Sequence, residues 1–441
     1  MSHGAQKRKF RSRTKLRART LVPTLIALTF FAPFASAQTF STLYAFGGAP
    51  DGAGPNGALI LDRAGNLYGT TVSGGKYACD TTNGSGGCGT IFKVTKNGVG
   101  SILHAFTDNP DGKEPYSGLL PTPSGTAYGT TYFGGSAYDG TVYKVDQTGT
   151  VTIIHNFLDR PDGRYPYLAT LVSDAAGNLY GTTENGGTDP FICFCGVVFK
   201  ISPSGQETIL HRFVGGPGDG SYPDAGLALD SSGNVYGTTF FGGSNCSGLG
   251  AGGGCGTIFR ISPSGKMTVL YNFTGGVDGA NPEGKLLLDS AGNLYGTAAY
   301  GAIACDPMNF GCGTIFKLDT SGKLTVLHTF TGAPDGASPV GGLIADPAGN
   351  AYGVTVYGGN ALCGDNSLLA PGCGTVYKIG IASKLTILHA FDQTDGATPN
   401  ASLVRDSAGN LYGTTSNGGN PICSYGRPPI VGCGTVFKIA P

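Results

Sequence analysis

Several common features are missing from this 441-residue sequence, and each absence excludes a class of protein. After residue 37 no apolar run approaches the 18 residues that a membrane-spanning helix requires, so we expect no membrane anchor in the mature chain. No stretch of that part sustains a helical period, which excludes a predominantly helical fold. Nucleophile-elbow, phosphate-loop, zinc-protease and dinucleotide-binding motifs are absent as well. The sequence therefore carries no familiar catalytic signature.

Clustered basic residues occur only in the first 37 residues. This segment holds eight Lys or Arg side chains, a short apolar stretch at 21–34 and the small residues Ala35-Ser36-Ala37 before Gln38. The pattern predicts a secretory signal peptide, with an uncleaved anchor as the alternative. Its removal leaves 20 basic against 28 acidic side chains, a net charge of −8. We expect a secreted protein, periplasmic or extracellular, that does not bind nucleic acid.

One tripeptide recurs along the remaining chain at intervals of 52 to 60 residues. Such a period is typical of repeat architectures, in which each unit buries its apolar face against its neighbours. The copies of Tyr-Gly-Thr begin at Tyr68, Tyr128, Tyr180, Tyr236, Tyr295 and Tyr412, and a Tyr-Gly-Val variant begins at Tyr352. The sequence thus contains seven copies of one unit.

Each copy contains four short segments that are rich in β-branched, aromatic and aliphatic residues and bounded by turn residues. In copy five these segments are 286–289, 294–297, 313–318 and 324–330. Seven such units predict an all-β, seven-bladed β-propeller with four antiparallel strands per blade; a linear β-solenoid is the alternative. Residues 39–46 match the fourth segment, and the chain ends after a third segment at 434–439. An N-terminal strand that completes the last blade would close the ring, so we expect residues 38–441 to form a single domain and a monomer.

Three further positions repeat with the unit. An Asp-x-x-Gly-Asn turn in six copies predicts capping of a hairpin by the carboxylate, and a Lys or Arg that closes the third strand predicts a solvated position. A histidine occurs at one site of the fourth strand in five copies. Because these sites lie a blade apart, we expect half-buried strand histidines rather than a metal site. The residues at this site are His104, His155, His211, His328 and His389, with Tyr44 and Tyr271 in the other two copies.

Cysteines occur as one pair in the loop between the second and third strands of six copies. Copy two lacks the pair and has the shortest loop, which indicates that the pair fastens an insertion. In an exported protein this pattern predicts local disulfides, with zinc as the alternative. The Cys193/Cys195 pair is the doubtful one, because a disulfide that closes so short a ring is strained. The pairs are Cys79/Cys88, Cys363/Cys373, Cys193/Cys195, Cys246/Cys255, Cys305/Cys312 and Cys423/Cys433.

The sequence Asp-Gly-x-x-Pro connects the fourth strand of each copy to the next copy. Asp-Gly followed by Pro is typical of a turn. The alternative is that the seven carboxylates form a ring near the propeller mouth, which could bind Ca²⁺. No other cofactor is expected. The seven aspartates are Asp51, Asp111, Asp162, Asp219, Asp278, Asp335 and Asp395.

The loops after strands two and four emerge on one face of a propeller, and here they are long and variable. Function concentrates in such loops, so we expect a binding face there. A single site must depend on residues that break the repeat, and tyrosines beside charged groups could bind sugars or a protein. These residues are Glu114, Tyr116, Arg164, Tyr165, Tyr167, Tyr222, Asp224 and Glu283. They could equally pack the loops.

The motif at Gly409–Thr415, with Gly418-Gly419 and Gly434–Ile439, resembles the Gloeo/Verruco (GloVer) tandem repeat. Its Asp-x-x-Gly-Asn-Leu-Tyr core is also similar to NHL-like propeller repeats. The resemblance covers essentially the whole mature chain and implies an exported bacterial repeat protein of unassigned activity, without catalytic residues to transfer. Members often carry a C-terminal sorting signal, which this chain lacks.

These observations favour a secreted binding or interaction module, for a glycan or a protein ligand, over an enzyme. A secreted polysaccharide hydrolase or lyase is the first alternative; Glu114 and Asp224 are carboxylates on this face, but the sequence gives no distance between them and so no case for a catalytic pair. A purely structural envelope protein is the second.

Overall fold

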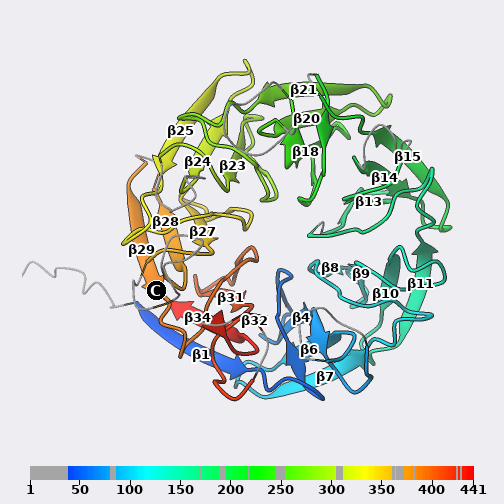
Figure 1. Ribbon diagram of the computed structural model, residues 1–441, viewed down its shortest axis with the longest axis vertical. Coiled ribbons are helices and arrows are strands. Elements are labelled where there is room, and N and C mark those ends of the chain that lie inside the picture. Colours follow the sequence, from blue (N-terminus) through cyan, green and yellow to red (C-terminus); the bar gives the residue numbers. More distant parts are fainter. Residues whose placement is uncertain are drawn as a thin grey trace, which may run out of the picture. The chain divides into compact units, whose positions relative to one another are not determined.

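Four antiparallel strands form each unit in the computed structural model of the protein (Figure 1). The structure describes residues 38–79, 86–168, 170–187, 195–216, 218–243, 254–303, 311–359, 363, 372–380, 383–423, 426–427 and 430–441. The predicted signal peptide, residues 1–37, lies outside the described residues. Among the residues described, no helix is long and apolar enough to cross a membrane.

The strands of a blade run from the inside of the ring to the outside in the order first, second, third and fourth. The first strands are β3 (Ile60–Leu61), β8 (Leu120–Pro121), β12 (Val172–Ser173), β17 (Ala228–Leu229), β22 (Leu287–Leu288), β26 (Ile344–Ala345) and β30 (Val404–Arg405). The second strands are β4 (Leu67–Thr71), β9 (Ala127–Thr131), β13 (Leu179–Thr183), β18 (Val235–Thr239), β23 (Leu294–Ala298), β27 (Ala351–Thr355) and β31 (Leu411–Thr415).

The third and fourth strands form the outer part of each blade. The third strands are β6 (Thr90–Val94), β10 (Thr141–Val145), β14 (Val197–Ile201), β20 (Thr257–Ile261), β24 (Thr314–Leu318), β28 (Thr375–Ile379) and β34 (Thr435–Ala440). The fourth strands are β7 (Gly100–Ala105), β11 (Val151–Asn156), β15 (Glu207–Arg212), β21 (Met267–Asn272), β25 (Leu324–Thr329), β29 (Leu385–Ala390) and β1 (Thr39–Ala45).

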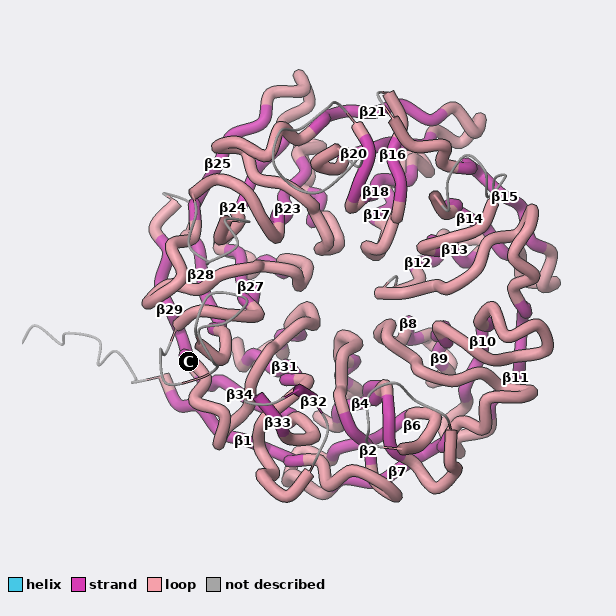
Figure 2. The backbone as a smooth tube through the Cα atoms, in the orientation of Figure 1, coloured by secondary structure: helices cyan, strands magenta, loops and turns pink. Residues whose placement is uncertain are grey.

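Two-residue strands pair in some of the loops, which Figure 2 shows as the tubes that connect the blades. These pairs are β2 (Gly52–Ala53) with β5 (Ser73–Gly74), β16 (Gly220–Ser221) with β19 (Phe241–Gly242), and β32 (Gly426–Arg427) with β33 (Ile430–Val431).

The last blade combines both ends of this domain. β1 pairs antiparallel with β34, in a register that places Phe40 opposite Ile439, and β34 pairs with β31. The predicted seven-bladed ring, completed by the N-terminal strand, is therefore confirmed.

The Tyr-Gly-Thr motif supplies the framework of each blade. The Tyr68 hydroxyl donates a hydrogen bond to Asp62 of the preceding turn (3.1 Å), and Lys93 lies 5.4 Å from the centre of the Tyr68 ring. The same Tyr–Asp hydrogen bond recurs in five other copies. A Cβ atom on Gly69 would lie 2.6 Å from the ring of Phe92, so only glycine lets this third-strand ring pack on the second strand.

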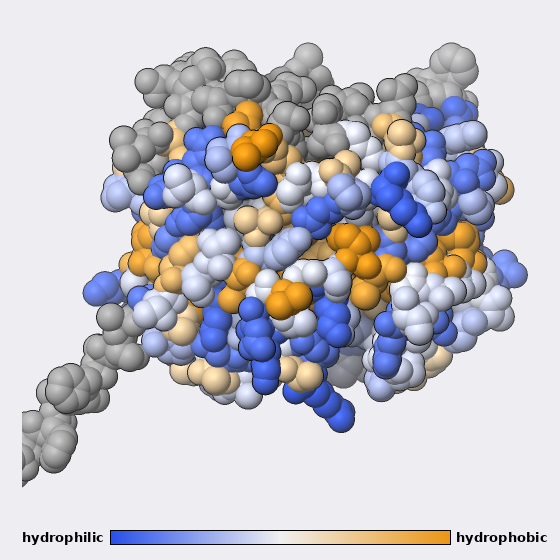
Figure 3. Space-filling view, turned by 90° about the horizontal axis from the view of Figure 1, so that it is seen from below, coloured by the Kyte–Doolittle hydropathy of each residue, from blue (hydrophilic) through white to orange (hydrophobic). Residues whose placement is uncertain are grey.

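Each pair of neighbouring blades shares a hydrophobic cluster. The phenylalanine after every fourth strand is fully buried and packs its ring against the third-strand Phe or Tyr of the next blade, with ring centres 4.9 to 5.3 Å apart. Seven such contacts hold the ring together. On the part of the outer wall seen in Figure 3, hydrophobic residues are scattered among hydrophilic ones, without one continuous apolar patch.

The residue before the proline of Asp-Gly-x-x-Pro has a left-handed backbone in all seven copies, with φ between 53° and 65°. In copy three this residue is Tyr165. Its N–H donates to the carbonyl of Asp139 in the preceding blade, and its carbonyl accepts from the N–H of Glu184. In the six other copies the equivalent N–H donates to the carbonyl of a cysteine that precedes the third strand. This backbone bridge fixes the direction of the residues around the proline.

Candidate functional site

The seven aspartates of Asp-Gly-x-x-Pro do not meet at the mouth of the propeller. Each accepts a hydrogen bond from the fourth-strand His or Tyr of its own repeat, as in Tyr44–Asp51 (2.9 Å) and His104–Asp111 (2.7 Å). The remaining pairs are His155–Asp162, His211–Asp219, Tyr271–Asp278, His328–Asp335 and His389–Asp395. The carboxylates also accept from backbone N–H groups of the turn that follows the strand. This arrangement gives them a structural role in each blade.

Disulfides fasten the loops between the second and third strands. The pairs Cys79–Cys88, Cys363–Cys373 and Cys423–Cys433 are bonded as predicted. Cys195, Cys255 and Cys312 are also disulfide-bonded, and their predicted partners Cys193, Cys246 and Cys305 lie outside the described residues. The three described pairs indicate an oxidising environment.

Four tyrosines gather on the face that carries these loops. Tyr116 and Tyr167 directly follow the prolines of copies two and three, Tyr165 precedes a proline, and Tyr132 follows β9. Ring centres lie 4.9 Å apart for Tyr116 and Tyr167, 5.4 Å for Tyr132 and Tyr167, and 5.2 Å for Tyr132 and Tyr165. All four residues are half-buried.

Three carboxyl groups adjoin the tyrosines. The Tyr132 hydroxyl donates to Glu184 (2.7 Å), and Tyr167 lies within electrostatic range of Glu184, Asp224 and Glu283. We call these seven residues the tyrosine–carboxyl cluster: Tyr116, Tyr132, Tyr165, Tyr167, Glu184, Asp224 and Glu283.

Burial raises the pKa of all three carboxyl groups. It raises the pKa of Glu283 to about 7, and it raises the pKa of Glu184 although Tyr132 and Asn185 donate hydrogen bonds to that group. Burial, followed by the neighbouring charges of Glu184 and Glu283, raises the pKa of Asp224 well above its usual range. Among the described residues, Asp224 Oδ1 is buried without a hydrogen-bond partner. The three carboxyl groups of the cluster therefore keep their protons to a higher pH than exposed carboxyl groups do.

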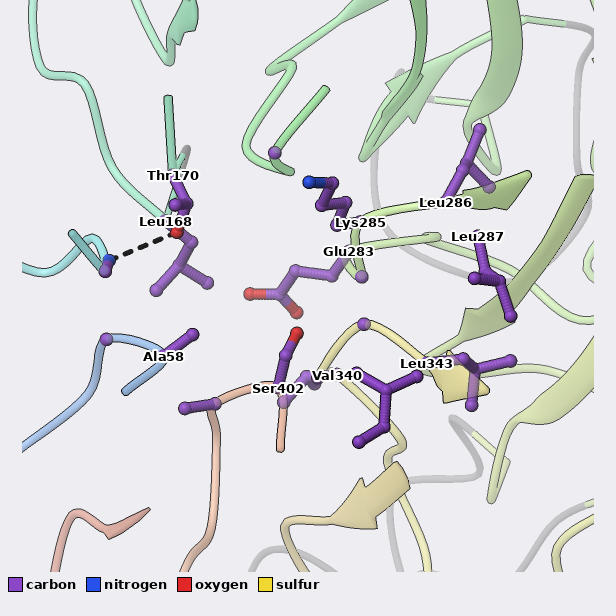
Figure 4. A pocket seen from close by; sticks show the side chains of 18 of the residues that line it. Ala58, Leu168, Thr170, Glu283, Lys285, Leu286, Leu287, Val340, Leu343 and Ser402 are labelled. Atoms are coloured by element: carbon purple, nitrogen blue, oxygen red, sulfur yellow. Dashed lines mark hydrogen bonds between the residues drawn. The ribbon is translucent and has the colours of Figure 1, made fainter. Parts of the chain in front are cut away.

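A cavity of about 480 Å³ continues from the cluster along the axis of the ring. Residues of all seven copies line it, and Tyr116 and Glu283 belong both to this lining and to the cluster. In Figure 4 the carboxyl group of Glu283 points into the cavity between Leu168 and Ser402, whereas the Lys285 side chain extends in another direction. The channel walls surround Glu283 although its carboxyl group reaches the cavity, which explains its weak acidity.

The sequence profile of the Gloeobacter/Verrucomicrobia repeat matches residues 77–305 and 250–441. The chain belongs to this repeat family. The resemblance expected from the motifs is thus confirmed. No curated protein matches the sequence.

Solved structures similar to this family member are propellers with little sequence identity to it. Virginiamycin B lyase from Staphylococcus aureus is 14% identical, with a TM-score of 0.55 over 92% of this chain and 99% of that chain. A streptogramin B lyase is 14% identical, with a TM-score of 0.53 over 91% and 97% of the two chains. The extracellular domain of a hybrid two component system from B. thetaiotaomicron is 12% identical, with a TM-score of 0.50 over 91% of this chain and 41% of that chain. At these identities the likeness concerns the fold alone.

The structure brings five of the sequence-predicted site residues of this repeat protein into the cluster, namely Tyr116, Tyr165, Tyr167, Asp224 and Glu283. The other three lie beside it. Glu114 is buried, hydrogen-bonded to Tyr116 and close to Lys113 and Asp108. Arg164 lies over the Tyr165 ring at 4.8 Å, and Tyr222 packs against Phe241 at 5.6 Å.

Sequence reasoning missed Tyr132 and Glu184, because they directly follow Tyr-Gly-Thr-Thr and only the loops after the second and fourth strands were searched for residues that break the repeat. The same criterion that selected the loop residues would have found them. The position is Val72, Phe240, Ala299, Val356 and Ser416 in the other copies, so a tyrosine and a glutamate break the repeat there.

Proposed function

We propose that this protein is an exported binding module that takes a carbohydrate at the tyrosine–carboxyl cluster. The observation that supports the proposal is the convergence of four half-buried tyrosines and three weakly acidic carboxyl groups at one end of the axial cavity. The N-terminal signal pattern and the disulfides support export.

The chemistry of the cluster suits a neutral, hydroxyl-rich ligand. Tyrosine offers a rigid apolar face for the C–H groups of a sugar ring and a hydroxyl at its edge. A protonated carboxyl group both donates and accepts hydrogen bonds, which matches a sugar hydroxyl without introducing a charge. The cavity volume lies within the range of pockets that enclose small ligands.

A catalytic role is the second candidate, and one observation favours it. A carboxyl group with a pKa of about 7, such as Glu283, is suited to give or take a proton near neutral pH. Such a group would serve a polysaccharide hydrolase or lyase. The similarity to two lyases adds nothing to this candidate, because it extends only to the fold.

Oligosaccharide binding measured by calorimetry tests the first proposal. We expect Tyr167→Ala to weaken binding about tenfold or more, because the variant loses the ring that contacts both Tyr116 and Tyr132. The matched control is Tyr271→His, which carries the residue found at that outer site in five copies and should leave affinity unchanged. Equal affinity of Tyr167→Ala and wild type for every ligand bound would contradict the proposed site.

Product analysis on the same oligosaccharides separates binding from catalysis. A binding module leaves them intact. Cleavage that Glu283→Gln abolishes, with affinity retained, would establish the catalytic candidate instead.

A further inference from the structure

The outer edge of the ring contains seven equivalent contacts between fourth strands of neighbouring blades, which we call seams. At each seam the His or Tyr that is hydrogen-bonded to the Asp-Gly aspartate lies next to one residue of the following blade. Tyr44 lies against Gly100 in this way, and His389 stacks on Phe40 with ring centres 3.7 Å apart. The strand register identifies this covering residue in all blades: Phe40, Gly100, Val151, Glu207, Met267, Leu324 and Leu385.

Glu207 is the only acidic residue among the seven. At its seam, His155 Nε2 lies 3.2 Å from Asp162 Oδ2 and 3.7 Å from Glu207 Oε1. One potential ligand atom from each of the three side chains lies within 4.8 Å of the other two. Each side chain is at most 16% exposed. The group therefore differs from an exposed acidic patch.

The spacing matches the coordination shell of a divalent transition metal. With bonds of about 2.0–2.1 Å, the ligand atoms of tetrahedral zinc lie about 3.4 Å apart, and the two distances from His155 fall on either side of this value. One imidazole and two carboxylates form a mixed nitrogen and oxygen set that suits zinc-like ions better than Ca²⁺ or Mg²⁺.

We propose that His155, Asp162 and Glu207 form a binding site for one zinc-class divalent ion at the seam between the second and third blades. Three protein ligands leave a coordination position for water. The ion would connect β11 and its following turn to β15, and so add a metal bridge between these two blades. Glu207 Oε1 is buried and has no hydrogen-bond partner among the described residues, so a metal bond would satisfy it.

Metal titration of tag-free, chelator-treated full chain tests the site. We expect about one Zn²⁺ per chain by calorimetry and visible absorption from bound Co²⁺. Mg²⁺ and Ca²⁺ should not compete.

Two site variants and one control locate the binding. Glu207→Leu carries the residue of two other seams and should lower Zn²⁺ affinity at least about 100-fold, as should Glu207→Gln. His328→Tyr, at a seam covered by Leu385, should leave affinity unchanged. The melting temperature of each metal-free variant shows that it is folded. Absence of Zn²⁺ binding by the wild type at micromolar concentrations, or unchanged affinity in both Glu207 variants, would overturn the proposal.

Discussion

The two halves of the propeller mouth share one backbone but differ in side chains. The residue that follows the proline is Tyr116, Tyr167, Asp224 and Glu283 in copies two to five, whereas copies six, seven and one carry Val340, Asn400 and Asn56. The left-handed residue before the proline occurs in all seven. The repeat therefore fixes where a side chain is presented, and local substitutions decide what is presented. The side chains presented at the mouth are therefore asymmetric although the framework is not.

The largest predicted effect is a loss of stability from substitutions in the blade framework. It should be equal in both halves, because the framework is the same in all copies. Gly181→Ala and Gly413→Ala each place a Cβ atom 2.5 Å from a buried third-strand ring, Phe199 and Phe437 respectively. We expect each to lower the free energy of unfolding by about 3 kcal/mol, near the upper end for overpacking. Chemical denaturation measures both. A loss confined to one half would show that the blades are not energetically equivalent.

A smaller effect should be specific to the half that carries the cluster. Because the folded pKa of Glu283 is about 7 against an ordinary value of 4.5, the folded state keeps a proton that the unfolded chain loses. Stability from this group is complete below pH 4.5 and declines as the pH rises to about 7. The full pKa difference corresponds to about 3 kcal/mol, and because Glu283 borders the open cavity we expect solvent to reduce the decline to about 2 kcal/mol.

Glu283→Gln tests this dependence, and Glu283→Val carries the residue of copy six. Both variants should gain stability over the wild type as the pH rises from about 4.5 to 7, measured as the difference in free energy of unfolding. A pH-independent difference between wild type and variant would contradict the weak acidity of Glu283.

The smallest predicted effect is a change in stability at one buried tyrosine in each half. Tyr143 and Tyr377 are fully buried, and their hydroxyl groups have no hydrogen-bond partner among the described residues, whereas the other five copies carry phenylalanine there. Tyr143→Phe and Tyr377→Phe should be neutral or stabilising by up to about 1 kcal/mol. A clear destabilisation of either variant would reveal a polar partner for that hydroxyl.

Much of the fold could be predicted from the sequence, because a seven-fold pattern reports the same strand arrangement seven times. The Asp62 turn, the Phe92 strand and the closing strand at 39–45 all follow from comparing copies. The spacing of residues along the sequence predicts a contact wherever both contacting residues belong to the same repeat.

Contacts between copies were not predictable in the same way. Glu184 reaches Tyr132 from the next blade, and Glu207 reaches His155 across a seam. Each residue stands alone in its own repeat, and only the three-dimensional register identifies its partner. For the same reason the sequence suggested only a metal site formed by several histidines. In the structure, the potential ligands that lie beside His155 are two carboxyl groups.

The pairing of β1 with β34 has a consequence for how the ring is assembled. Six blades consist of contiguous sequence, so each can form from local segments with little loss of loop-closure entropy. The seventh joins segments from opposite ends of the domain, a contact of the highest possible sequence separation, and such contacts slow folding. The last blade should therefore form last, after the C-terminal strand has become available, and until then the first and sixth blades expose the apolar faces that it covers.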